Sequence, residues 1–84
     1  MIINEIVASA KEYGARRVIL FGSAVEDIEK ARDIDIACDG IDGWAFYEFG
    51  ALLENKLSRS LDIVSLTPTT PFTRHIETYG RVLL

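Results

Sequence analysis

The segment from residue 18 to residue 38 constrains the fold of this chain more than any other. It consists of the apolar run Val-Ile-Leu-Phe at 18–21, the pair Gly22-Ser23, and the sequence Asp-Ile-Asp-Ile at 33–36. An apolar run without alternation is typical of a strand covered on both faces. The second run also predicts a strand, and because successive side chains of a strand point to opposite faces, Asp33 and Asp35 share one face. The segment therefore predicts two strands joined by a turn, with two carboxylates on one side of a sheet.

A third aspartate, Asp62, lies in a similar apolar frame, Leu-Asp-Ile-Val at 61–64. Like charges on one face repel each other, and a shared divalent cation relieves the repulsion at neutral pH. Asp62 would complete, with Asp33 and Asp35, a pocket for one or two magnesium ions. This pattern is typical of phosphoryl or nucleotidyl transfer.

The pair Gly22-Ser23 adds a second feature of such a site. Gly22 has no side chain to obstruct the approach of the backbone to a ligand, and Ser23 offers a hydroxyl and an N–H to a phosphate oxygen. Alone, the pair would be interpreted as an ordinary turn and helix cap. The acidic pair downstream, Asp33 and Asp35, favours the functional interpretation.

Together these motifs resemble the polymerase β type nucleotidyltransferase superfamily, in which a strand ending in Gly-Ser is followed by an Asp-x-Asp strand and later by a strand with one Asp. With 84 residues, the chain is similar to the minimal nucleotidyltransferase (MNT) branch. The resemblance covers nearly the whole length, and residues 73–84 resemble the closing helix and short strand of that branch. It implies an α/β (α+β) fold, a small mixed β-sheet with helices packed on it, as a single domain at 1–84.

The resemblance also implies an activity. It is the Mg2+-dependent transfer of a nucleoside monophosphate, AMP from ATP, to a hydroxyl acceptor. Asp33, Asp35 and Asp62 would be the catalytic residues and the ligands of two magnesium ions, and Gly22 and Ser23 would bind the nucleotide phosphates. The implied partner is a helical HEPN-type toxin, which the transferase would neutralise as an antitoxin, by binding it or by adenylylating one of its tyrosines.

The chain departs from the family directly after the Gly-Ser pair. Where minimal nucleotidyltransferases commonly carry arginine and glycine, it has Ala-Val-Glu-Asp at 24–27. This change removes a cation that would grip the triphosphate, and four basic residues could replace it: Lys30, Arg32, Lys56 and Arg59. Two other interpretations therefore stay open, a catalytically degenerate module that binds its partner without chemistry, and a structural α/β domain with acidic strand ends.

Composition narrows the partners and the setting. The net charge of −4 and the pI near 4.8 predict a surface that repels a nucleic-acid backbone. No apolar run approaches the roughly 20 residues of a membrane span, and the N-terminus does not resemble a signal peptide. A single cysteine, Cys38, fits a cytoplasmic protein and is expected to be a small buried hydrophobe. A homo-oligomer stays open.

The remaining elements follow from periodicity and breaker residues. Helices are predicted over the first dozen residues, ending at Gly14, from Ser23 through 25–29, and over 44–57 with Asp42 as its N-cap. Asp39 and Asp42 are expected not to bind a metal ion, and Arg16 and Arg17 are expected to be only solvated. The helix at 44–57 has a wide apolar surface, so Trp44 or Tyr47 could stay exposed and mark a partner surface.

The C-terminal part is predicted to form a strand at 61–66, a last helix and a strand-like tail at 81–84. Thr70 should cap this helix, with Pro71 in its first turn and Gly80 at its end. Its buried stripe is predicted to be Phe72, Ile76 and Tyr79. His75 is expected to be a partly buried helix residue rather than a general base.

Overall fold

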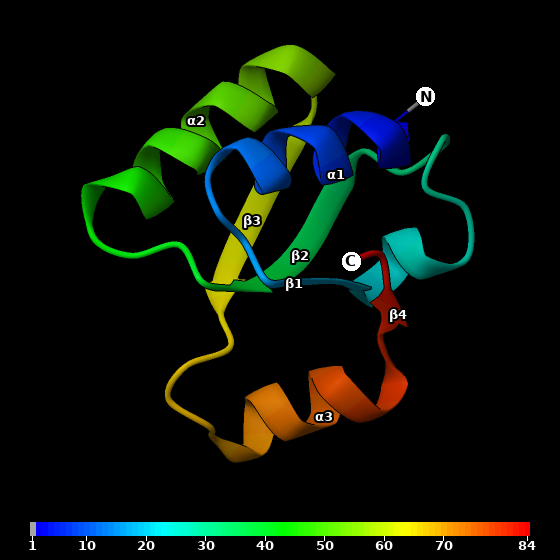
Figure 1. Ribbon diagram of the computed structural model, residues 1–84. Helices are drawn as coiled ribbons and strands as arrows, with labels where there is room; N and C mark the ends of the chain where they lie inside the picture. Colours follow the sequence, from blue (N-terminus) through cyan, green and yellow to red (C-terminus); the bar gives the residue numbers. More distant parts are fainter. Residues whose placement is uncertain (1) are drawn as a thin grey trace.

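A computed structural model describes residues 2–84, which fold into a sheet between two layers of helices (Figure 1). The elements in chain order are α1 (Ile2–Glu12), β1 (Arg17–Phe21), the 3-10 helix η1 (Gly22–Val25), β2 (Asp33–Asp39), α2 (Trp44–Leu57), β3 (Ser60–Ser65), α3 (Pro71–Tyr79) and β4 (Arg81–Val82). The strands form one sheet in the order β3-β2-β1-β4. Because β2 is parallel to β3 and antiparallel to β1, the sheet is mixed, as the resemblance implied.

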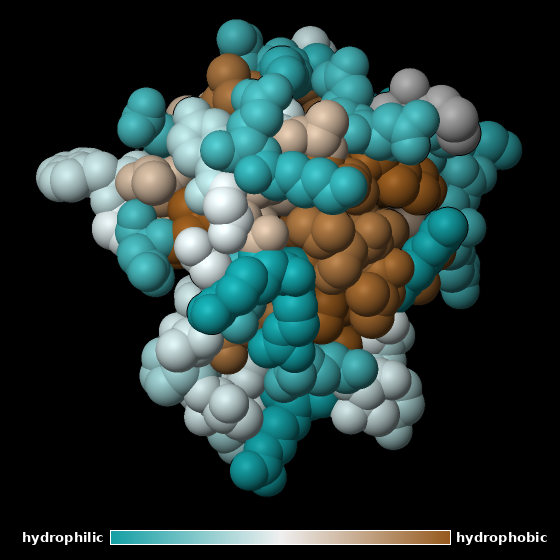
Figure 2. Space-filling view, in the orientation of Figure 1, coloured by the Kyte–Doolittle hydropathy of each residue, from teal (hydrophilic) through white to brown (hydrophobic). Residues whose placement is uncertain are grey.

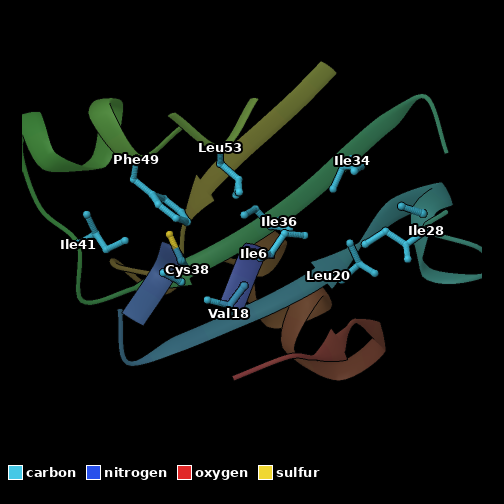
Figure 3. Packing of buried hydrophobic residues seen from close by; sticks show 12 residues of the cluster. Ile6, Val18, Leu20, Ile28, Ile34, Ile36, Cys38, Ile41, Phe49 and Leu53 are labelled. Atoms are coloured by element: carbon cyan, nitrogen blue, oxygen red, sulfur yellow. The ribbon is translucent and has the colours of Figure 1, made fainter. Parts of the chain in front are cut away.

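The main hydrophobic core lies between the sheet and the pair α1 and α2 (Figure 3). One face of β2 contributes Ile34, Ile36 and Cys38 to it, and α2 contributes Phe49 and Leu53. Within α2 the two residues lie one turn apart, so they point to the same side of the helix. Both are fully buried, so this face of α2 holds the helix on the sheet.

A second, smaller core lies on the opposite face of the sheet, under α3. It consists of Ile19, Ala37, Leu66 and Ile76. Since the flanking residues Val18 and Leu20 belong to the main core, β1 is covered on both faces, as its unbroken apolar run predicted. On the side of the molecule seen in Figure 2, apolar side chains gather in the middle, where Figure 1 places the C-terminal end of the chain.

The capping residues of α3 explain where this helix begins and ends. The Thr70 side chain accepts a hydrogen bond from the Thr73 backbone N–H at 3.1 Å, and the Thr73 hydroxyl accepts one from the Thr70 N–H at 2.8 Å. This reciprocal pair satisfies donors that the first turn of a helix leaves free. Pro71 occupies the first turn and Gly80 the C-cap, so the predicted ends of α3 are confirmed.

One predicted helix end and one predicted N-cap are wrong. The short helix expected to begin at Ser23 and run through 25–29 is the 3-10 helix Gly22–Val25, so it starts near the expected residue but ends at Val25, and turns follow it up to β2. The N-cap of α2 is Gly43 rather than Asp42, and no side chain caps the helix there. Gly43 has a φ of +59°, a backbone conformation that glycine adopts without strain, so the chain turns into α2 through backbone geometry.

The predicted buried stripe of α3 is wrong at both ends. Ile76 is buried together with Thr73, but Phe72 is 52% exposed and Tyr79 72% exposed. His75 is exposed as well, rather than partly buried. The core beneath α3 is small, so a narrow strip of the helix suffices to cover it, and the neighbouring aromatic side chains stay outside. Within residues 2–84, no helix has the length and apolar character needed to span a membrane.

Candidate active site

The strand register brings the predicted acidic residues to one end of one face of the sheet. Asp35 of β2 lies opposite Asp62 of β3, and Asp33 lies opposite Ser60. Paired residues of neighbouring strands point to the same side, and the strands lie about 4.8 Å apart. Asp33, Asp35 and Asp62 therefore share the face that carries α3, and Asp62 is not on the far side of the sheet.

We call this end of the sheet, with Asp33, Asp35 and Asp62, the acidic end, and its charges affect Asp35 most. The pKa of Asp35 is raised above its ordinary value of 3.8, first by burial, then by the charge of Asp62 and a side-chain hydrogen bond with it, and then by the charge of Asp33. Asp33 and Asp62 are exposed, while Asp35 is half-buried between them and β1. The ionised form of Asp35 is thus destabilised by its surroundings, and a cation at this position would reverse that effect.

The donor set fits a magnesium ion that arrives with a phosphate ligand. Among residues 2–84, no three or more His, Cys, Asp or Glu side chains are grouped so as to hold a metal ion by themselves. Magnesium usually takes only one or two protein carboxylates and completes its shell with water and substrate phosphates. The paired carboxylates of Asp35 and Asp62, with Asp33 beside them, meet that requirement.

Gly22 closes the acidic end from the side of β1. Its φ is +75°, and a Cβ atom built on it would lie 2.5 Å from Oδ2 of Asp35. Any other residue would therefore be strained in its backbone and would also displace this carboxylate. Ser23 follows in η1 and is exposed, so its hydroxyl is open to a ligand beside the acidic end.

Comparison with known proteins places this geometry in a known fold. No protein-family model matches the sequence, and no curated protein matches it. Among solved structures, a toxin–antitoxin complex with AMP-PNP is similar over 100% of this chain and 73% of that chain, with 24% identity and a TM-score of 0.81. A complex of a tri-AMPylated HEPN toxin of Shewanella oneidensis with an MNT antitoxin is similar over 99% and 69%, with 25% identity and a TM-score of 0.77.

The chain has the minimal nucleotidyltransferase fold. An MntA-HepT toxin–antitoxin structure agrees, with 24% identity, a TM-score of 0.75, and coverage of 99% of this chain and 69% of that chain. The resemblance read from the Gly-Ser pair and the three aspartates is thereby confirmed, as is the expected mixed sheet with packed helices.

Two of the four basic residues that could replace the missing arginine of the minimal nucleotidyltransferase pattern make hydrogen bonds elsewhere. Arg59 donates from Nη1 to the carbonyl oxygens of Ile28 at 2.7 Å and Ala31 at 3.1 Å, and so fixes the loop before β2. The Lys56 ammonium donates to the Ser9 hydroxyl at 3.5 Å.

The Lys30 ammonium lies 3.9 Å from a carboxylate oxygen of Asp27, but its side chain is exposed to solvent. Arg32 is exposed and makes no hydrogen bond or ion pair within residues 2–84. Lys30 and Arg32 are therefore the remaining candidates for a triphosphate contact.

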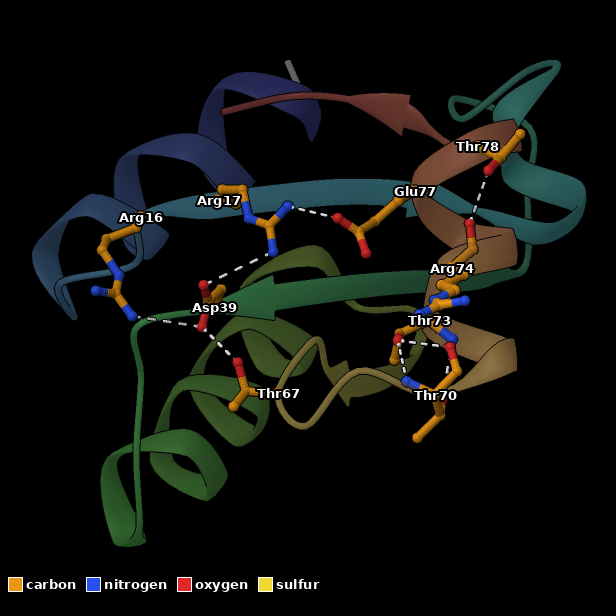
Figure 4. A network of polar contacts seen from close by, with 9 residues as sticks. All are labelled: Arg16, Arg17, Asp39, Thr67, Thr70, Thr73, Arg74, Glu77 and Thr78. Carbon is orange, nitrogen blue, oxygen red and sulfur yellow. Dashed lines mark hydrogen bonds and ion pairs between the residues drawn. The ribbon is translucent and has the colours of Figure 1, made fainter.

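Asp39, at the other end of β2, belongs to a structural network instead of a metal site (Figure 4). It accepts a hydrogen bond from the Thr67 hydroxyl at 3.0 Å and lies 3.6 Å from Arg16 and 3.8 Å from Arg17. These partners, Thr67 before the arginines, lower the pKa of Asp39. Arg17 also donates to Glu77 of α3 at 2.7 Å, so both arginines are paired, contrary to the expectation that they are only solvated.

A cavity of about 420 Å3 lies beside the acidic end, between the end of β1 with η1 on one side and α3 on the other. The helical periodicity of the sequence does not predict it, because it assigns Phe72 and Tyr79 to a buried stripe with Ile76. The spacing of Phe72, His75 and Tyr79, three and four residues apart, is the signal that could have indicated a second aromatic face of α3.

Cys38 is buried in the main core, as expected. Burial, followed by the charge of Asp39, raises the pKa of its thiol to about 11. It therefore stays a neutral thiol at physiological pH and takes no part in the site.

Proposed function

We propose that this protein is a magnesium-dependent nucleotidyltransferase that transfers AMP from ATP to a hydroxyl group of a partner protein. The observation that carries the proposal is the pairing of Asp35 with Asp62 beside Gly22, because it joins carboxylates from two strands to an exposed glycine that lies against one of them. Similar structures include one with AMP-PNP and one with an AMPylated HEPN toxin, which support this reaction. The acceptor would be a tyrosine of a HEPN-type toxin, and this chain would be its antitoxin.

In the proposed reaction, the acceptor oxygen attacks the α-phosphorus of ATP. A new P–O bond forms, and the bond between the α-phosphorus and the oxygen bridging to the β-phosphate breaks. Pyrophosphate leaves with that electron pair, and the hydroxyl proton passes to water. Asp33, Asp35 and Asp62 would hold two magnesium ions, whose charge would stabilise the leaving pyrophosphate and would lower the pKa of the hydroxyl. Gly22 would let the triphosphate approach the backbone, and Ser23 would donate hydrogen bonds to it.

A partner has to contribute the acceptor, and the surface of α2 supports a protein contact. Trp44 is 85% exposed and Tyr47 71% exposed, with their ring centroids 6.2 Å apart. Exposed aromatic pairs of this kind are enriched in protein interfaces. A cytoplasmic location, where such a partner would be met, is part of the same proposal.

The test is incubation with Mg2+, a co-expressed HEPN-type protein and ATP that carries 32P at the α-phosphate. A labelled partner band is expected with the α-labelled nucleotide and none with γ-labelled ATP, because the γ-phosphate leaves in pyrophosphate. The variant Asp35→Asn should abolish the label. Asp42→Asn is the matched control, because Asp42 is an exposed aspartate outside the acidic end and its replacement removes the same charge.

Two results would contradict the proposal: labelling that persists in Asp35→Asn, or a folded partner that is never labelled by the wild-type protein. A label from γ-labelled ATP would mean phosphate transfer instead of AMP transfer. EDTA added before the ATP should prevent labelling, because it withdraws the Mg2+ that the proposed reaction needs.

A second candidate function is favoured by the segment at 24–27 and by the position of Arg59. Because the Arg59 guanidinium is held by two backbone carbonyl oxygens, the chain could neutralise a helical partner by binding alone. Thermal unfolding with and without MgATP separates the two functions, because a ligand that binds only the folded state raises the melting temperature. No shift at millimolar MgATP would favour the binding module.

A further inference from the structure

Helix α3 presents two different faces, and only one of them is used by the core. Thr73 and Ile76 are buried toward the sheet. Phe72, His75 and Tyr79 follow one another at intervals of three and four residues, which places them together on a neighbouring face. The His75 and Tyr79 rings have centroids 4.7 Å apart, and all three side chains are exposed, so this aromatic face lies outside the buried core.

This aromatic face forms one wall of the cavity of about 420 Å3. The opposite wall is formed by Phe21, Gly22, Val25 and Glu26, and Phe72 meets Phe21 edge to face with ring centroids 5.8 Å apart. Sites for small molecules usually have volumes of about 300 to 1,000 Å3 and combine apolar walls with a few polar groups. The cavity meets both conditions.

The cavity is continuous with the acidic end of the sheet. Phe21 lies opposite Asp35 in the antiparallel register of β1 and β2. Gly22 lines the cavity and also lies against the Asp35 carboxylate, since a Cβ built on it would be 2.5 Å from Oδ2. A ligand whose phosphates reach Asp35 can therefore place its other end among the aromatic side chains.

The polar groups of the cavity indicate the chemistry of that other end. A Glu26 carboxylate accepts hydrogen bonds and repels phosphate, so it favours a ligand part with N–H donors. His75 can donate and accept. A flat aromatic ring with an exocyclic amino group can interact with both walls, because the ring stacks on the aromatic side chains and the amino group donates a hydrogen bond to the carboxylate.

We propose that this cavity binds the nucleobase of the substrate nucleotide, with the base stacked on the aromatic face of α3 and its exocyclic amino group donating to Glu26. The proposal rests on the proposed function, because it assigns the base of the same ATP. It gives a role to Glu26, whose negative charge is unfavourable beside a triphosphate but favourable beside an amino group.

The test measures the binding of adenosine in the absence of Mg2+, by isothermal titration calorimetry or by NMR chemical shifts. Adenosine has no phosphate, so its binding reports the cavity and not the acidic end. Tyr79→Ala should lower the affinity for adenosine about five-fold or more, which is the low end of what stacking of one base contributes. Tyr47→Ala is the matched control, since Tyr47 is 71% exposed and Tyr79 72% exposed, and Tyr47 lies on α2 away from the cavity.

Glu26→Gln tests the amino group separately. The wild-type protein should bind adenosine more tightly than inosine, which carries a carbonyl oxygen where adenosine carries the amino group. Glu26→Gln should reduce this preference, because an amide can also donate to the carbonyl. Both Tyr79 and Glu26 are exposed, so neither variant removes a buried contact of the core.

Three results would overturn the proposal: no adenosine binding at tens of millimolar, equal losses in Tyr79→Ala and Tyr47→Ala, or binding of N-acetyltyrosinamide in place of adenosine. The last would make the cavity the acceptor site. Failure of the proposed function is distinguishable, because adenosine would then still bind while no AMP is transferred. Conversely, AMP transfer that is undiminished in Tyr79→Ala would leave the function intact and reject the base site.

Discussion

Replacing Gly22 by alanine tests the close approach of β1 to the acidic end, and the chain contains its own reference for the comparison. Gly14 has a φ of +85° and Gly22 a φ of +75°, so alanine is strained in the backbone at both positions. A Cβ on Gly14 would meet nothing within 4 Å, whereas a Cβ on Gly22 would lie 2.5 Å from Oδ2 of Asp35. The difference between the two variants therefore isolates the contact with this carboxylate.

The expected magnitudes follow from these two contributions. The left-handed backbone costs about 1–2 kcal/mol for a residue with a Cβ, and the loss of freedom in the unfolded chain offsets about 0.4–1 kcal/mol of that. Gly14→Ala should thus lower the free energy of unfolding by about 1 kcal/mol. Gly22→Ala also forces the Asp35 side chain from its rotamer, which adds about 0.5–1.5 kcal/mol.

The assay is urea unfolding followed by far-UV circular dichroism, without Mg2+ or nucleotide. Fluorescence is less suitable, because the single tryptophan, Trp44, is already 85% exposed in the folded protein. Gly22→Ala should unfold at lower urea than Gly14→Ala and melt about 4–8 °C lower for each additional kcal/mol.

Combining Gly22→Ala with Asp35→Ala should recover the additional loss, since the displaced carboxylate is then absent. Equal stabilities of the two glycine variants, or no recovery in the double variant, would refute the placement of Asp35 against Gly22.

Asp35→Asn should raise the melting temperature at pH 7 without Mg2+, because the raised pKa of Asp35 means that its ionised form destabilises the fold. The gain in melting temperature should shrink as the pH falls toward 3.8 and below, where the carboxyl group is protonated in both states. A lower melting temperature of the variant at pH 7 would contradict the argument. Asp39→Asn should lower the free energy of unfolding by about 1 kcal/mol at pH 7. The lowered pKa of Asp39 stabilises the fold above 3.8, so this difference should fade as the pH falls through the folded-state pKa, and a difference that is constant with pH would show that the charge is unimportant. The Cys38 thiol should not react with a thiol reagent at pH 8 until urea unfolds the protein, since it is buried with a pKa of about 11, and rapid reaction of the native protein would show that the core opens at β2.

The fold could be predicted from the sequence wherever a pattern of residues was compatible with one kind of element only. The alternation of Asp33, Ile34 and Asp35 could place the carboxylates on one face only, and α2 extends over the predicted residues 44–57. The apolar frame of Asp62 indicated a strand that could join the acidic pair, but its register opposite Asp35 could not be predicted, because register depends on contacts between strands distant in sequence.

The features that the sequence did not predict depend on tertiary structure. Phe72 and Tyr79 are spaced equally well for a core stripe with Ile76 and for a cavity wall with His75, and only the small size of the core under α3 decides between them. Likewise, nothing in the local sequence around Arg59 shows that it binds the carbonyl oxygens of Ile28 and Ala31. Such a contact, 28 to 31 residues away along the chain, requires the folded structure.

The most direct test of the central claim is paramagnetic relaxation by Mn2+ added together with AMP-PNP, read from the backbone amide signals of the protein. Mn2+ prefers the same oxygen ligands as Mg2+ and broadens the signals of nearby residues. The structure predicts that the amide signals of Gly22, Asp35 and Asp62 broaden at the lowest Mn2+ concentration, and that those of Asp39 and Asp42 broaden only when more Mn2+ is added. Broadening centred on Asp39 and Asp42, or no selective broadening at all, would contradict a metal and nucleotide site at the acidic end of the sheet.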